Sequence, residues 1–190
     1  FYAVSAFIGL FTIIRYLGLN SALVKYIPEF LVKGDKGNIK SSIAIVVVIQ
    51  TLTVLAFTGI ILVFHNSITS SLFKTGGADS VLILMTLSFL PSLFFMIFQS
   101  VFQGYQKLRT YSLIEPVRIS LTFMFSVALI SMGVVGVAFA YLGAAILTTL
   151  VFFYSFYKLD IFAAKAKITS DILKKILKFS MPVFVSSIAI

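Results

Sequence analysis

The chain of 190 residues contains no cysteine, no tryptophan and a single histidine, His65. Without cysteine it can form neither disulfide bonds nor thiolate metal sites. Acidic residues are also few, with six Asp and Glu against fifteen Lys and Arg. The sequence shows no paired carboxylates, no metal-ligand cluster and no phosphate-binding glycine loop with its lysine. We therefore expect neither an enzyme nor a bound cofactor.

Charged residues of both signs make up only 11% of the chain, whereas ordinary soluble domains carry about 25%. Hydrophobic residues reach 60%, and the mean hydropathy is +1.11. A soluble core of this size cannot bury so much apolar surface, so the chain is predicted to lie in a membrane. The net charge of +9 would suit nucleic acid only on one basic face of a soluble fold. Because the charges lie between apolar runs, we expect no nucleic-acid partner.

Long apolar segments define the expected fold, since a spanning helix needs about 20 such residues. Five segments qualify or nearly do, and a sixth starts where the chain ends; their residues are 1–19, 42–64, 81–102, 113–132, 135–157 and 179–190. Runs such as IAIVVVI are apolar on every face, which favours helices over the alternating strands of a β-barrel. The fold class is thus all-α, a polytopic transmembrane bundle with about five full spans plus the start of a sixth. Since both ends lie in apolar sequence, we expect a fragment of a longer protein.

Basic residues alternate between the connections. The connections 20–41, 103–118 and 158–178 are rich in Lys and Arg, whereas 65–80 has only Lys74 and the connection near residues 133–136 has none. By the positive-inside rule the rich connections are cytoplasmic. The stretch ITSDILKKILK in 158–178 is predicted to form an amphipathic helix on the inner surface, where anionic lipid attracts its lysines. We expect a multi-pass protein of the cell membrane, and the amino-acid usage suggests a prokaryote.

Polar residues in or near the spans are the candidate functional residues, and each has two interpretations. Arg15 either snorkels to the inner interface or faces a cavity and binds a phosphate. Glu115 and Arg118 lie three apart on one helical face, so they form either a simple ion pair at a helix start or a gate at the cytoplasmic mouth. Gln99 and Gln103 share a face and either bond neighbouring helices or contact a sugar.

Small residues and prolines predict how the spans pack. Pro91 cannot donate a hydrogen bond to the carbonyl of Leu87, so the third span should kink there, and Pro182 should act likewise in the last segment. Pro116 suits the first turn of a helix. The series Gly136, Ala140 and Ala144 lets a neighbouring helix approach closely.

Three stretches together resemble polysaccharide-biosynthesis flippases of the multidrug/oligosaccharidyl-lipid/polysaccharide exporter superfamily. GLNSALVKYIPEFLVKGD resembles the loop after the second helix of that family, and FQGYQKLRTYSLIEPVRIS resembles the junction of its fourth and fifth helices. LKFSMPVFVSS resembles the start of its seventh helix. The resemblance implies that residues 1–157 form most of a first lobe, 158–178 a cytoplasmic inter-lobe linker and 179–190 the start of the next helix. The missing second lobe of the same chain is then a partner.

The resemblance also implies a function: flipping a polyprenyl-linked oligosaccharide across the cytoplasmic membrane by alternating access, in contact with membrane lipids. Cations facing the cavity would hold the diphosphate; the candidates are Arg15, Lys25 and Arg118, with Gln99, Gln103 and Glu115 as secondary ones. One alternative is a cation-coupled multidrug exporter of the same superfamily, which would need carboxylates at mid-depth. A membrane glycosyltransferase or polymerase and a non-transporting membrane scaffold are further alternatives.

Overall fold

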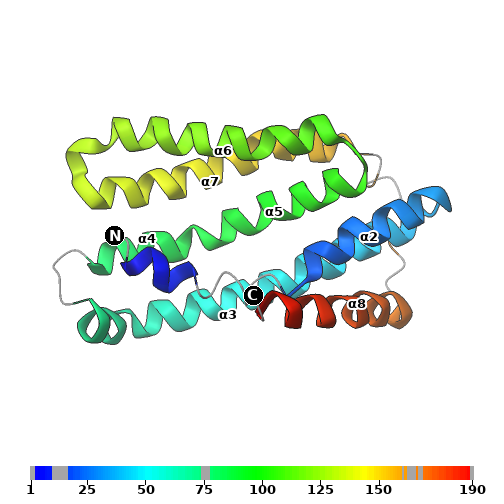
Figure 1. Cartoon of the computed structure of the whole chain (residues 1–190), viewed down its shortest axis with the longest axis horizontal. Coiled ribbons are helices and arrows are strands. Elements are labelled where there is room, and N and C mark those ends of the chain that lie inside the picture. Colours follow the sequence, from blue (N-terminus) through cyan, green and yellow to red (C-terminus); the bar gives the residue numbers. More distant parts are fainter. Residues whose placement is uncertain are drawn as a thin grey trace.

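The computed structural model describes residues 3–9, 17–73, 78–159, 161, 166 and 169–188, and all statements on structure refer to these. Within them every regular element is helical, so the all-α fold class is confirmed. After a first helical segment at residues 3–9, the elements are α2 (Leu19–Val32), α3 (Lys36–Leu72), α4 (Ala78–Leu87), α5 (Phe89–Gly104), α6 (Leu108–Ala128), the short 3₁₀ helix η1 (Ile130–Met132), α7 (Gly133–Tyr157) and α8 (Ser170–Ile188). They lie side by side along one long axis (Figure 1).

Three of the predicted spans are long and apolar enough to cross a membrane. The segments 42–64, 81–102 and 135–157 fall within the candidate spans Lys36–Ser71, Ala78–Gly104 and Ile130–Tyr157. About five full spans are not confirmed. The segment 113–132 corresponds to α6, which ends at Ala128 and whose first half carries Arg109, Glu115 and Arg118. The segment 1–19 includes residues 10–16, which lie outside the described residues.

The connection 20–41 was expected to be a loop, and this prediction is wrong for most of its length because α2 occupies it. Leu19, Leu23 and Ile27 recur every fourth residue and are at most 1% exposed, so α2 has an apolar face that packs into the bundle. A Cβ atom on Gly104 of α5 would lie 2.9 Å from the Cβ of Ile27. The missing side chain at Gly104 therefore lets α2 and α5 approach closely.

Pro91, Pro116 and Pro182 act differently in their helices. The helix carrying Pro91 is interrupted at Ser88, directly after Leu87, whose carbonyl Pro91 leaves without a donor. The expected kink is thus confirmed as a break between α4 and α5. Helix α8 continues through Pro182. Helix α6 begins at Leu108, so Pro116 lies in its interior and the prediction of a first-turn position is wrong.

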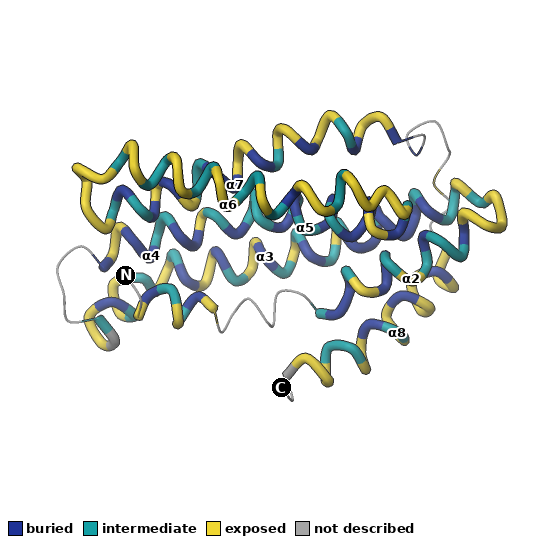
Figure 2. Tube along the Cα trace, turned by 45° about the horizontal axis from the view of Figure 1, so that its top comes forward, coloured by how far each residue is buried: buried dark blue, intermediate teal, exposed yellow. Residues whose placement is uncertain are grey.

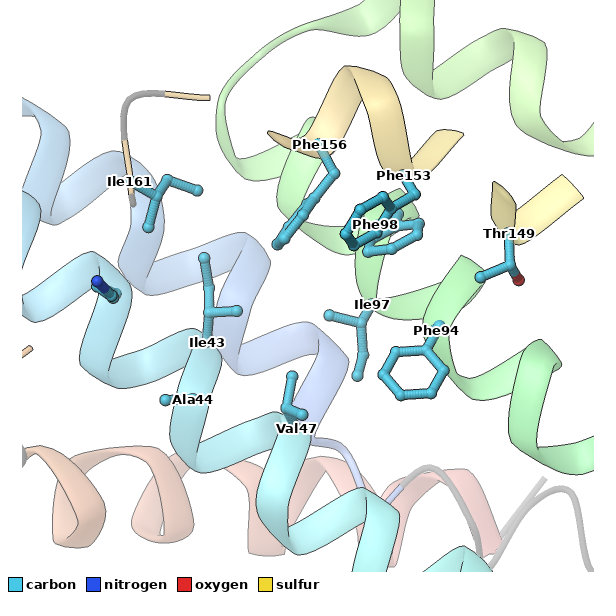
Figure 3. Close-up of a pocket in the computed structure, with 11 residues that line it drawn as sticks. Ile43, Ala44, Val47, Phe94, Ile97, Phe98, Thr149, Phe153, Phe156 and Ile161 are labelled. Carbon is cyan, nitrogen blue, oxygen red and sulfur yellow. The ribbon is translucent and has the colours of Figure 1, made fainter. Parts of the chain in front are cut away.

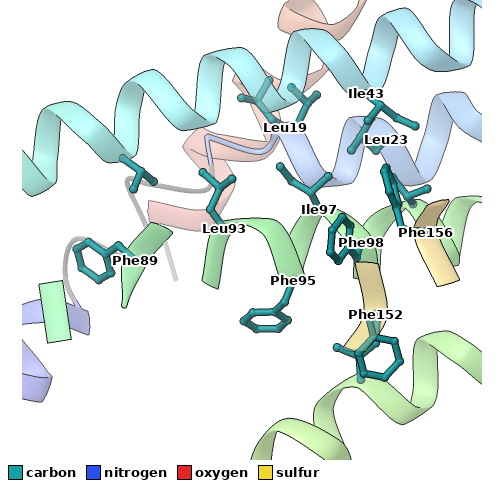
Figure 4. Packing of buried hydrophobic residues seen from close by; sticks show 14 of the residues in the cluster. Leu19, Leu23, Ile43, Phe89, Leu93, Phe95, Ile97, Phe98, Phe152 and Phe156 are labelled. Carbon is teal, nitrogen blue, oxygen red and sulfur yellow. The ribbon is translucent and has the colours of Figure 1, made fainter. Parts of the chain in front are cut away.

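Helix α5 lies at the centre of the bundle, where it contacts α2, α3, α6 and α7. Its buried side chains Leu93, Ile97 and Phe98 pack among residues from those neighbours, including Leu23 of α2 and Phe156 of α7 (Figure 4). The outer helices are much more exposed (Figure 2), and Ile114 is the residue of α6 that is fully buried. Such an apolar outer surface suits contact with lipid rather than water.

The predicted small-residue series lies at the interface of α7 with its neighbours. Gly136, Ala140 and Ala144 are all buried. A Cβ atom on Gly136 would lie 2.2 Å from the carbonyl oxygen of Leu129, just before η1. The absence of a side chain at Gly136 therefore lets the hairpin between α6 and α7 close tightly, as the series predicts.

The lysine-rich connections lie together at one end of the bundle. The α2–α3 and α5–α6 connections, the end of α7 and the start of α8 are at this end, whereas the α6–α7 connection is at the opposite end (Figure 1). We call the first the cation-rich end; its basic residues are Lys33, Lys36, Lys40, Lys107, Arg109, Lys158, Lys174, Lys175 and Lys178. The alternation read from the sequence thus corresponds to a spatial separation, and its cytoplasmic side stays a prediction.

Candidate functional site

The turn that begins α2 is a helix break, and it lies against α8. Leu17 and Gly18 have φ values of 45° and 64°, in the left-handed region that ends or begins helices rather than continuing them. A Cβ atom on Gly18 would lie 2.5 Å from the carbonyl oxygen of Ser180 in α8. Glycine is therefore required here twice, by its backbone angle and by the close approach.

A polar cavity of about 410 Å³ opens beside this break, between α2, α5 and α8. Its polar lining side chains are Asn20 and Ser21 of α2, Gln99 and Ser100 of α5, and Ser187 of α8. Met96, Val183 and Phe184 form the apolar part of the lining. The side-chain amides and hydroxyls both donate and accept hydrogen bonds, so the cavity offers polar contacts within a partly apolar wall. The described lining residues include no charged side chain.

A buried amide extends the polar lining toward α3. Gln50 is 3% exposed, and its Nε2 donates a hydrogen bond to Oδ1 of Asn20 at 3.2 Å. This bond joins α3 to the first turn of α2 and orients the Asn20 amide, because its oxygen must face Gln50. Through its Nε2, Gln50 therefore bonds a neighbouring helix.

The two glutamines predicted as a pair have different surroundings. Gln99 is half-buried and lines the polar cavity. Gln103, one turn further toward the cation-rich end, is exposed and does not line it. A shared helical face therefore does not give a shared site, because the cavity includes Gln99 and ends before Gln103.

Glu115 and Arg118 form the ion pair that their spacing predicts, with Nε of Arg118 donating to Oε2 of Glu115 at 3.1 Å. The Arg118 guanidinium also lies over the ring of Phe95, with 5.6 Å from its Cζ to the ring centroid. Helix α6 packs against α5 and α7, whereas the polar cavity is lined by α2, α5 and α8. The structure therefore does not bring this pair into the cavity that holds Gln99.

Lys25 lies at the contact between α2 and α8, nearer the cation-rich end. Its Nζ is 4.2 Å from the ring centroid of Phe179, which itself meets Tyr26 edge to face. On the same face of α2, the hydrogen bond from Lys33 lowers the pKa of exposed Glu29 from its ordinary value, and the charges of Lys175 and Lys25 add to this effect. Lys25 itself is exposed, contacts the ring of Phe179 and does not line the polar cavity.

One predicted site residue lies outside the described part of the chain, and some residues that line the cavity were not predicted. Arg15 lies outside the described residues. Asn20 and Ser187 line the cavity but were not singled out from the sequence. The stretch LGLN carries a usable signal for Asn20, since a glycine two residues before an amide within apolar sequence is typical of a helix break that exposes polar groups.

The all-helical fold and its long apolar helices define a helical membrane protein. The chain belongs to the polysaccharide biosynthesis protein family, whose model matches residues 1–190. An uncharacterized membrane protein of Methanocaldococcus jannaschii is 31% identical over 140 residues, covering 68% of this chain and 27% of that protein.

A solved structure shows a similar fold. It is an outward-facing conformation of a multidrug resistance MATE family transporter of the MOP superfamily, with a TM-score of 0.79 and 21% sequence identity. The match covers 99% of this chain and 45% of that one. The chain thus spans less than half the length of the proteins it matches, and at this identity the likeness shows the fold.

Proposed function

We propose that the protein is a membrane transporter that flips a polyprenyl-linked oligosaccharide across the cytoplasmic membrane of a prokaryote. The observation that supports this most is the polar cavity at the start of α2, lined by Asn20, Gln99 and Ser187 from three helices. Amide and hydroxyl groups are the partners that sugar hydroxyls need. Membership in the polysaccharide biosynthesis protein family supports the same substrate class.

The proposed mechanism is alternating access. The glycan passes through the polar cavity while the lipid tail stays in the bilayer, so the transporter supplies hydrogen bonds and forms no covalent bond. Gln99 and Asn20 would bond the glycan, and Lys25, near the cation-rich end, would attract the diphosphate at entry. Arg118 is held by Glu115, so contact of Arg118 with a phosphate would require this pair to open. Arg15 remains a proposed diphosphate ligand.

A multidrug exporter is the second candidate, because the solved structure with the similar fold is named as a multidrug resistance transporter. Cationic drugs and coupling ions are commonly bound through carboxylates. The described residues that line the polar cavity include no carboxylate. The lining therefore favours a neutral, hydroxyl-rich substrate over a cationic drug.

Replacement of Gln99 tests the proposal. We expect Gln99→Leu to reduce the flipping rate of lipid-linked oligosaccharide in proteoliposomes about 3- to 10-fold, the loss expected for one hydrogen bond. Gln103→Leu is the matched control, since the same amide is removed one turn outside the cavity, and it should leave the rate unchanged. Equal rates for the wild type and both variants would contradict a role for this cavity, and transport of a cationic drug without any flipping would favour the exporter.

A further inference from the structure

A second cavity of about 450 Å³ lies between α3, α5 and α7, and its chemistry is opposite to that of the polar cavity. Its walls are apolar, with Val47 of α3, Phe94 and Phe98 of α5, and Phe153 and Phe156 of α7 around it (Figure 3). We call it the apolar groove. The aromatic rings of Phe98 and Phe156 pack together with centroids 4.6 Å apart and form one of its walls.

Apart from Lys40, the described lining residues of the apolar groove offer no polar group that needs a ligand. Thr149 is the hydroxyl residue among its described lining residues, and its one hydroxyl hydrogen is already shared between the carbonyl oxygens of Pro91 and Ala145, at 2.9 Å and 2.8 Å from Oγ1. Apolar cavities with satisfied walls exclude water and accept apolar ligands of matching size. A sugar or a phosphate would lose its hydrogen bonds here, so the occupant must be a hydrocarbon chain.

A cation marks one end of the apolar groove. Lys40 is the charged residue among its described lining residues, and it belongs to the cation-rich end. The lining on α3 runs from Lys40 to Val47 and that on α7 from Thr149 to Phe156, each about 10 Å along its helix. This length is about a third of the roughly 30 Å hydrocarbon core, so the groove suits a chain entering from one leaflet.

We propose that the apolar groove binds one acyl chain of an anionic phospholipid from the leaflet at the cation-rich end, with the headgroup phosphate beside Lys40. The charge complementarity between Lys40 and the phosphate selects the headgroup, and the groove holds the chain. A spanning helix is too long for a groove of this extent, since it needs about 20 residues and 30 Å. The site is separate from the polar cavity and does not depend on the transported substrate.

Photolabelling in lipid nanodiscs tests this site on the full protein. The probes are phosphatidylglycerol and phosphatidylcholine with the same photoactivatable acyl chain, and mass spectrometry locates the labelled residues. We expect phosphatidylglycerol to label groove residues such as Val47 and Phe153 about fivefold more than phosphatidylcholine, the factor expected for one lysine near an anionic headgroup. Equal labelling by the two lipids, or labelling that spares the groove, would overturn the proposal.

Variants test separately what the charge of Lys40 and the space in the apolar groove contribute to lipid binding. Lys40→Gln should lower phosphatidylglycerol labelling to the phosphatidylcholine level, whereas Lys40→Arg should preserve it and shows that the fold survives substitution. Lys107→Gln is the matched control, because it removes an exposed cation of the same end that does not line the groove. Ala44→Phe, which fills the groove from α3, should abolish labelling by both lipids. An equal effect of Lys40→Gln and Lys107→Gln would mean general surface charge and would contradict a specific site.

Discussion

At the scale of single residues, spacing predicts local pairs well and distant contacts poorly. The pairing of Glu115 with Arg118 follows from helix geometry alone. The contribution of Asn20 to the polar cavity depends on α5 and α8, which are some 80 and 160 residues further along the chain. Nothing in the local sequence states which helix comes next to α2. The structure shows that α8 is such a neighbour, because its Ser180 approaches Gly18 so closely that a side chain there would clash.

Gly18→Ala tests this contact. The left-handed backbone at φ 64° should cost an alanine about 1–2 kcal/mol, and the clash 2.5 Å from the Ser180 carbonyl about 1–3 kcal/mol more. Gly34→Ala has the same kind of strain at φ 68° but no atom within 4 Å of the new Cβ, so it should lose only the first amount. Denaturation of the purified protein measures both losses. Equal losses for the two variants would show that α8 does not approach Gly18.

At the scale of elements, the apolar runs predict α3, the α4–α5 helix and α7, because their length and composition leave no other structure in a membrane. Helix α2 was missed because Lys25 and the three lysines that follow the helix indicate a loop, while its apolar face of Leu19, Leu23 and Ile27 is visible only as a four-residue period. Helix α6 was predicted as a span, but its charged residues leave open how much of the helix lies in lipid. Pro91 correctly predicted the break between α4 and α5.

The hairpin of α6 and α7 offers a test at this scale. In Gly136→Ala the new Cβ would lie 2.2 Å from the carbonyl oxygen of Leu129, so we expect the free energy of unfolding to fall by about 1–3 kcal/mol. In Gly143→Ala the new Cβ would meet only the Phe125 ring at 3.4 Å, and the gain in helix propensity should leave stability unchanged or raised by up to about 1 kcal/mol. Thermal denaturation compares the two. A Gly136→Ala protein as stable as Gly143→Ala would contradict the tight hairpin.

At the scale of the whole molecule, the alternation of basic and non-basic connections is the most informative feature of the sequence. It predicted which connections share an end of the bundle, and the structure places them together (Figure 1). The two cavities differ in chemistry, because amides and hydroxyls contribute to the lining of the first, beside Met96, Val183 and Phe184, whereas aromatic and aliphatic side chains dominate the second. Neither cavity was predictable, since each is built from three helices whose neighbours are set by long-range packing.

Residue accessibility in oriented membrane vesicles tests most directly that the two ends of the bundle lie on opposite sides of a membrane. Because the chain has no cysteine, single cysteines at Lys33, Lys107 and Ser131 can be read with a membrane-impermeant maleimide. Positions 33 and 107, at the cation-rich end, should be labelled from one side, and position 131, in the α6–α7 connection, only from the other. Labelling of positions 33 and 131 from the same side of intact vesicles would contradict the account.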